Sequence, residues 1–199
     1  MEDIDKSNQL QTADQKIAPG LRDLLGIFYG LAIASGMKRA ADVLVDPCHF
    51  PAAVHLVLPL SLGALLVGVS DWALFYRLIA EQRYEPRWRI FLDLLFPVIV
   101  FCMFYASLWL DVYMGFGCAY FALSAWYIVL MKSQNIKGIP PCALPLASVL
   151  AVLLGAGFIV GRCTSDLGAT PCASLVWIVG CGTGLSWIVC SGRLIMSAR

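Results

Sequence analysis

Five charged residues lie within stretches that are otherwise apolar, and their types and spacing suit them best for chemistry. If those stretches cross a membrane, each charge is costly to bury, so each residue is a functional candidate by default. Lys38 and Asp42 are four residues apart and can neutralise one another on one helix face. The five residues are Lys38, Arg39, Asp42, Asp71 and Asp93.

Asp71 and Asp93 form the more informative pair. They fall at similar depth on two consecutive apolar stretches that run antiparallel, and arginines flank both. One interpretation is a structural clamp, in which the carboxylates pair with Arg77, Arg87 or Arg89 and tie one helix to the next. The other is a path for an ion or a proton through the two carboxylates.

The apolar stretches that carry these charges number six, and each is about as long as the roughly 20 residues that a helix needs to cross a bilayer. The chain has 199 residues, of which 60% are hydrophobic and 14% charged, against about 25% charged in ordinary soluble domains. The stretches do not alternate as barrel strands would. The sequence therefore predicts an all-α, polytopic transmembrane helical bundle, with spans over residues 24–45, 52–76, 90–110, 112–131, 142–161 and 172–190.

The N-terminal part of the chain divides into a polar tail and the first apolar stretch. Residues 1–20 are polar and form a cytoplasmic tail, flexible or partly helical, that we expect to end at a break in Pro19-Gly20. Residues 21–199 form the transmembrane domain. Because Lys38, Arg39 and Asp42 interrupt the first stretch, a helix lying on the membrane surface is the alternative to a first span.

The loops predict an orientation, because cytoplasmic loops accumulate Lys and Arg. With six spans, most basic residues fall on the side of the two termini, so both termini are predicted to be cytoplasmic. The shortest loop, around Asp111, permits only a tight turn, which makes the third and fourth helices neighbours. The main cytoplasmic feature is the link over residues 77–89, which is either an interfacial anchor or a docking surface for a partner. The residues of that link with docking character are Arg77, Arg83, Tyr84, Arg87, Trp88 and Arg89.

The cysteines and the other polar residues show no motif of a catalytic or metal-binding site. The eight cysteines contain no C-x-x-C pair, and no His-rich, Ser/Lys or paired-Cys constellation is present, so we expect no catalytic site, no metal and no cofactor. Cys163 and Cys172 could be bridged on the outer side. The net charge of +1 gives no reason to expect nucleic-acid binding. Three Gly-x-x-x-Gly faces favour close helix packing and a homo-oligomer in the lipid bilayer; they begin at Gly26, Gly157 and Gly180.

Several runs resemble a known group of bacterial membrane proteins. They are Phe28-Tyr29-Gly30-Leu31-Ala32-Ile33-Ala34, Ser70-Asp71-Trp72, Tyr76-Arg77 and Arg89-Ile-Phe-Leu-Asp93. Over roughly residues 24–110 the chain resembles the KwaA-like membrane subunits of the Kiwa phage-defence system. The resemblance implies an inner-membrane oligomer that senses phage attack and works with a soluble cytoplasmic effector.

Two functions follow as expectations. The first is a non-enzymatic sensor or scaffold that assembles in a bacterial inner membrane and docks a cytoplasmic partner through the link over residues 77–89. The second is a small ion channel or transporter that uses the intramembrane carboxylates.

Overall fold

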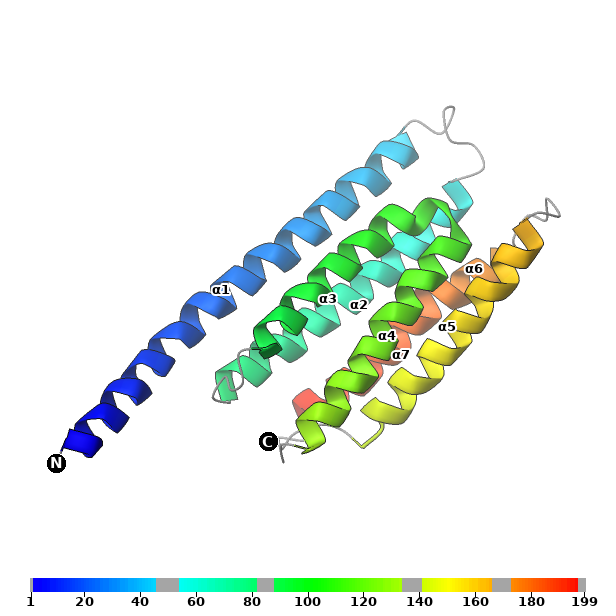
Figure 1. The fold of residues 1–199 in the computed structure, drawn as a ribbon. Helices are drawn as coiled ribbons and strands as arrows, with labels where there is room; N and C mark the ends of the chain where they lie inside the picture. Colours follow the sequence, from blue (N-terminus) through cyan, green and yellow to red (C-terminus); the bar gives the residue numbers. More distant parts are fainter. Residues whose placement is uncertain (1, 46–53, 82–87, 134–140, 166–172, 197–199) are drawn as a thin grey trace.

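A computed structural model describes residues 2–45, 54–81, 88–133, 141–165 and 173–196, and every element in these ranges is helical (Figure 1). This confirms the all-α helical bundle. In chain order the elements are α1 (Glu2–Val45), α2 (Val54–Glu81), α3 (Trp88–Tyr105), the 3₁₀ turn η1 (Ala106–Leu108), α4 (Leu110–Ser133), α5 (Ala143–Ser165), α6 (Ala173–Trp177), the π-helical turn η2 (Ile178–Gly182) and α7 (Thr183–Met196).

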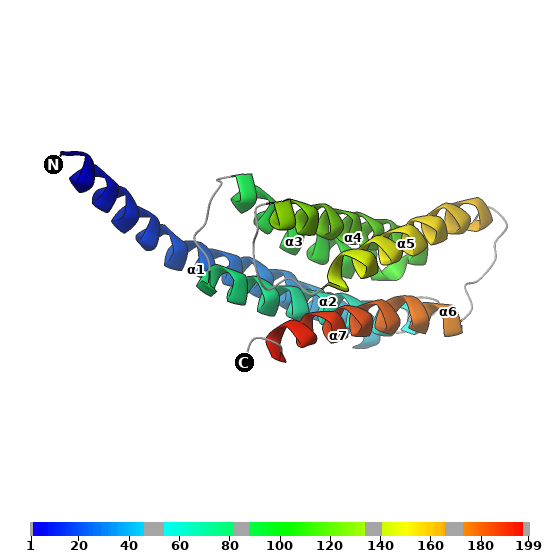
Figure 2. The ribbon, with the colours of Figure 1, turned by 90° about the horizontal axis from the view of Figure 1, so that it is seen from below.

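The helices run antiparallel along a common direction. α6, η2 and α7 follow one another as a single rod that packs beside α2 (Figures 1 and 2). α1 begins and α7 ends at the same end of the bundle, and the first part of α1 projects beyond the other helices. Two termini on one face of a membrane require an even number of passes, and the common end of α1 and α7 is consistent with that.

Length and composition identify the described helices that can cross a membrane. Four qualify, and a fifth apolar stretch, Ala173–Val189, is shorter. The chain is therefore built as an integral membrane protein. α1, for which the sequence predicts a span over residues 24–45, is absent from the four, and it carries Lys38, Arg39 and Asp42 near its end. The four candidate spans are His55–Leu74, Phe91–Leu108, Leu110–Ser133 and Ala143–Cys163.

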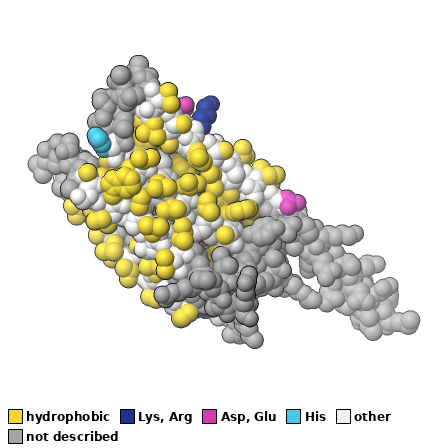
Figure 3. Space-filling view, turned by 180° about the vertical axis from the view of Figure 1, so that it is seen from behind, with side chains coloured by type: hydrophobic (Ala, Val, Ile, Leu, Met, Phe, Trp, Pro, Cys, Tyr) yellow, Lys and Arg dark blue, Asp and Glu magenta, His cyan; other side chains and the backbone are white. Residues whose placement is uncertain are grey.

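The outer surface of the bundle agrees with a lipid environment. Large apolar side chains are exposed on most helices, with Phe91 75% exposed, Val152 70% and Ile178 66%. Figure 3 shows hydrophobic side chains over the middle of one face, while the charged side chains in view lie at its margins. In water such a surface would mark an interface or an aggregation site; in hydrocarbon it needs no cover.

Two boundary predictions are wrong. Pro19 and Gly20 lie inside α1 rather than at a break. A proline inside a helix removes one hydrogen bond and costs about 3 kcal/mol without having to end the helix, and Pro59 and Pro97 also lie within helices.

The turn after the third span comes earlier than residue 110. α3 ends at Tyr105, and Trp109 is extended, with φ −132° and ψ 110°. The Trp109 N–H donates to the Ala106 carbonyl oxygen over 2.9 Å. Asp111 then falls in the first turn of α4, where a carboxylate is stabilised by the helix dipole. The turn is as tight as predicted, but it is made by η1 and Trp109.

Glycines set the closest approach between helices. A β-carbon at Gly63 would lie 2.2 Å from the Gly180 carbonyl oxygen, and one at Gly180 would lie 2.2 Å from the Pro59 carbonyl oxygen. The backbones of α2 and η2 are thus in direct contact, which only glycine permits, and the π turn of η2 falls at this crossing. π turns are frequent at functional sites.

Of the three Gly-x-x-x-Gly faces, two pack against other helices of the chain. Gly157 and Gly161 pack against Met114 and Asp111 of α4, and Gly180 packs on α2. A β-carbon at Gly30, by contrast, would meet no atom of the described residues within 4 Å. Two faces therefore serve packing within the chain, and the homo-oligomer stays a prediction.

Candidate intramembrane polar site

Asp71 and Asp93 are the carboxylates at the centre of the bundle. Asp71 is 2% exposed and Asp93 is fully buried. Each lies on the inward face of its helix, because Asp71 follows the buried Val67 by four residues and Asp93 precedes the buried Phe96 by three. The two groups are near enough to interact electrostatically. The predicted pair is therefore brought together in one cluster.

The partner of Asp71 comes from α1. The hydroxyl of Tyr29, which is 1% exposed, donates a hydrogen bond to Asp71 Oδ2. Tyr29 shares the inward face of α1 with Leu25 and Ala32. The sequence analysis did not single out Tyr29. It could have been found as the residue with a polar hydroxyl on the otherwise apolar face that Leu25 and Ala32 share with it.

Asp93 is rich in unused acceptors. Neither of its carboxyl oxygens has a hydrogen-bond partner among the described side chains. Its main-chain carbonyl cannot receive the usual bond from the residue four positions on, because that residue is Pro97. The carboxyl group and the main-chain carbonyl of Asp93 thus both lack a well-formed hydrogen bond of the usual kind among the described residues.

α4 supplies the other wall of the site. Tyr113, Tyr120 and Tyr127 recur every seven residues and are 0%, 0% and 5% exposed. The Tyr120 hydroxyl is close enough to the Asp71 carboxyl to interact with it, and Tyr127 is close to Asp93 in the same way. In the described part of the chain, the hydroxyls of Tyr113 and Tyr120 have no well-formed hydrogen bond.

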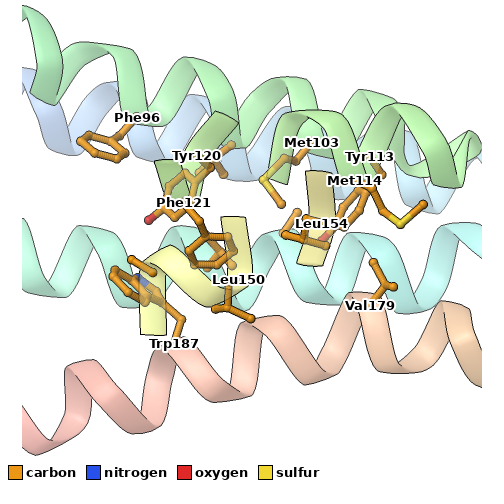
Figure 4. Packing of buried hydrophobic residues seen from close by; sticks show 14 of the residues in the cluster. Phe96, Met103, Tyr113, Met114, Tyr120, Phe121, Leu150, Leu154, Val179 and Trp187 are labelled. Atoms are coloured by element: carbon orange, nitrogen blue, oxygen red, sulfur yellow. The ribbon is translucent and has the colours of Figure 1, made fainter. Parts of the chain in front are cut away.

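Aromatic packing fixes the rings of these tyrosines. Phe96 makes edge-to-face contacts with Tyr120 (centroids 5.4 Å apart, 75°) and with Tyr127 (5.9 Å, 87°). Trp187 of α7 lies edge-to-face with Tyr120 at 6.4 Å and with Phe121 at 5.5 Å. Figure 4 shows Phe96, Tyr120, Phe121 and Trp187 as one packed group between the helices. Such pairs contribute about 0.5–1.5 kcal/mol each beyond burial, so the hydroxyls are held in place by the core.

The charges of α1 do not join this cluster. Lys38 and Asp42 are exposed. Arg39 is half-buried, and its guanidinium carbon lies 5.0 Å from the centroid of the Tyr105 ring. Residues 38–42 lie about 14–20 Å along α1 from Tyr29 at 1.5 Å per residue. Only two of the five intramembrane candidates therefore meet.

Other sequence predictions fall partly outside the described residues. Arg83, Tyr84 and Arg87 lie in the segment that is not described, and the side chains of Arg77, Trp88 and Arg89 are not described either, so the docking surface and the arginine clamp stay predictions. Cys163 is a free, exposed thiol, and Cys172 lies outside the described residues.

An ion pair that the sequence did not indicate lies at one end of α4. Arg162 Nη1 of α5 is 3.2 Å from Asp111 Oδ2, with the two side chains 63% and 17% exposed. The two residues are 51 positions apart, so nothing in their local spacing couples them.

Comparisons with protein-family models, with curated proteins and with solved structures find no match to this chain.

Proposed function

We propose that this protein is a small channel or transporter that moves a cation across the membrane by way of Asp71 and Asp93. The observation that carries the proposal is the burial of both carboxyl groups together, with the oxygens of Asp93 unpartnered among the described side chains. No lysine or arginine in the described part of the chain acts on either group.

The balance of donors and acceptors gives the sign of the ion. A buried charge is tolerated only when it is paired and hydrogen-bonded, and the described groups that act on these two carboxyls are themselves oxygen-bearing side chains. Here Tyr29 supplies one donor to Asp71, and the nearest groups to Asp93 are a tyrosine and a second carboxyl. A site with excess acceptors attracts positive charge and repels anions. A cation that enters and leaves would neutralise the carboxylates while it is bound.

The membrane setting belongs to the same proposal. Six passes, with the rod α6–η2–α7 as the last, would place both termini in the cytoplasm of a bacterium and the bundle in its inner membrane. The common end of α1 and α7 supports this orientation, as does the gathering of Lys and Arg on one side in the sequence. The sensor or scaffold that docks a soluble effector stays a prediction from the sequence.

Ion flux in reconstituted liposomes tests the proposal. Wild-type protein should carry at least one of H⁺, Na⁺ and K⁺ above the leak of empty liposomes. The double variant Asp71→Asn/Asp93→Asn, which keeps the size of both side chains, should lose that flux. Asp42→Asn is the matched control, because Asp42 is an exposed carboxylate outside the cluster. Equal flux in the double variant and the wild type, or no flux in the wild type, would contradict the proposal.

A further inference from the structure

We infer that the transported cation is a proton and that its route is a ladder of tyrosine hydroxyls along the inner face of α4. The ladder consists of Tyr113, Tyr120 and Tyr127, and the inference rests on the function proposed above. Seven residues are close to two helical turns, so the three side chains stay on one face. At 1.5 Å per residue they span about 21 Å of a hydrocarbon core that is about 30 Å thick.

The burial of the ladder is the first argument. Tyr113 and Tyr120 are fully buried, and in the described structure neither hydroxyl makes a well-formed hydrogen bond. A buried polar group without a partner lowers stability, and phenylalanine would fill the same space without that penalty. The hydroxyls therefore add nothing to packing, which leaves a role for the O–H group itself.

The carboxyl groups occupy the spaces beside the ladder. Asp93 lies near Tyr127 and Asp71 near Tyr120, while Tyr29 donates to Asp71 from the opposite wall. A hydroxyl accepts a proton on one lone pair and releases its own, and a carboxyl takes a proton on one oxygen and gives it up from the other. Each transfer breaks one O–H bond and forms another, so a proton that enters at Tyr127 is matched by one that leaves at Tyr113.

The spacing separates a proton from a metal ion. Successive ladder hydroxyls are about 10 Å apart along the helix, so they cannot surround one ion, whereas a hard metal cation needs about six oxygens at once. Water can bridge hydroxyls and carboxyls over such gaps by accepting and donating in turn. The arrangement therefore suits a relay rather than a coordination site.

The far end of the ladder meets the helix crossing. A β-carbon at Gly63 would lie 2.7 Å from the Tyr113 hydroxyl and 2.2 Å from the Gly180 carbonyl oxygen. Cys181 of η2 also lies near Tyr113. The hydroxyl thus ends beside the π turn, where Thr183 Oγ1 donates to the Val179 carbonyl oxygen over 2.5 Å. Figure 4 shows Tyr113 above Val179 at this end of the cluster.

Proton flux through single hydroxyl deletions tests the ladder. Tyr120→Phe and Tyr113→Phe are each reconstituted in liposomes with a pH-sensitive dye inside and a potassium diffusion potential as driving force. Each should lower proton flux by at least about tenfold, since a positioned proton-transfer group contributes about 10²–10⁴ to a rate. The unfolding temperature in detergent should equal or exceed the wild-type value, because each variant removes a buried hydroxyl without a well-formed hydrogen bond. Tyr105→Phe is the matched control, because Tyr105 is 42% exposed and outside the ladder.

Wild-type proton flux in both ladder variants would overturn the inference. If Tyr120→Phe does not yield folded protein, Tyr113→Phe decides alone, because it removes an equally buried and unpartnered hydroxyl. Flux of Na⁺ or K⁺ that depends on Asp93, without proton flux, would overturn the ladder and leave the proposed function standing. No flux of any cation in the wild type would overturn both.

Discussion

Removing the Tyr29 hydroxyl should uncouple α1 from the carboxylate cluster. Tyr29→Phe keeps the buried ring and deletes only the donor to Asp71 Oδ2. The carboxyl oxygen is then left buried without that partner, which costs about 1–3 kcal/mol. At about 2–4 °C per kcal/mol for a chain of this size, the unfolding temperature should fall by about 2–12 °C.

Thermal unfolding of the purified protein in detergent measures this shift. Tyr105→Phe is the control, because it removes a hydroxyl from an exposed tyrosine and retains the ring below Arg39. A double-mutant cycle of Tyr29→Phe with Asp71→Ala, which removes the acceptor, should give a coupling energy of about 0.5–3 kcal/mol. An unchanged unfolding temperature for Tyr29→Phe, or additive effects in the cycle, would refute the cross-helix hydrogen bond as a stabilising contact.

Three further changes test the fold. Gly180→Val places a side chain on a main-chain oxygen 2.2 Å away, so it should cost about 1–3 kcal/mol or more and reduce the yield of monodisperse protein. Gly30→Val is the control and should purify normally, because no atom of the described residues lies within 4 Å of a β-carbon there; equal yields of the two variants would disprove the close crossing. Arg162→Gln breaks an exposed pair with Asp111 and should cost no more than about 1 kcal/mol, measured as a small fall in unfolding temperature; a large fall would mean that the pair does more than the structure indicates. A topology reporter at the C-terminus should give a cytoplasmic signal and one in residues 166–172 an exterior signal, and a cytoplasmic signal at 166–172 would rule out six passes.

The sequence located the carboxylates but did not indicate the tyrosine that bonds to one of them. Asp71 and Asp93 stand out because an acid within an apolar run can be tolerated only if it faces inward. The arginines predicted as partners have side chains outside the described part of the structure, and the hydrogen bond that is described at Asp71 comes from Tyr29, 42 residues away. A contact between distant helices depends on how each helix is rotated about its axis, and the spacing of residues within one helix does not predict that rotation.

The same reason limits what could be said of the fold. Apolar length predicted the helices, and the basic residues predicted that the chain ends return to one side. The sequence indicated only one of the two glycines at the crossing of α2 and η2. Gly180 belongs to a Gly-x-x-x-Gly face, whereas its counterpart Gly63 has no glycine three or four residues away. The predicted break at Pro19 is absent because a proline lowers the stability of a helix by about 3 kcal/mol without having to end it.

The most direct test of the central claim compares cation flux in Asp93→Asn and Asp93→Glu with flux in the wild type, at matched amounts of protein in liposomes. Asparagine keeps the size of the Asp93 side chain and an oxygen that can still accept from the nearby Tyr127 hydroxyl, so Asp93→Asn should keep the wild-type unfolding temperature. Because asparagine cannot ionise and glutamate can, Asp93→Asn should abolish the flux and Asp93→Glu should restore part of it. Wild-type flux in a folded Asp93→Asn variant would contradict a function that depends on this carboxylate.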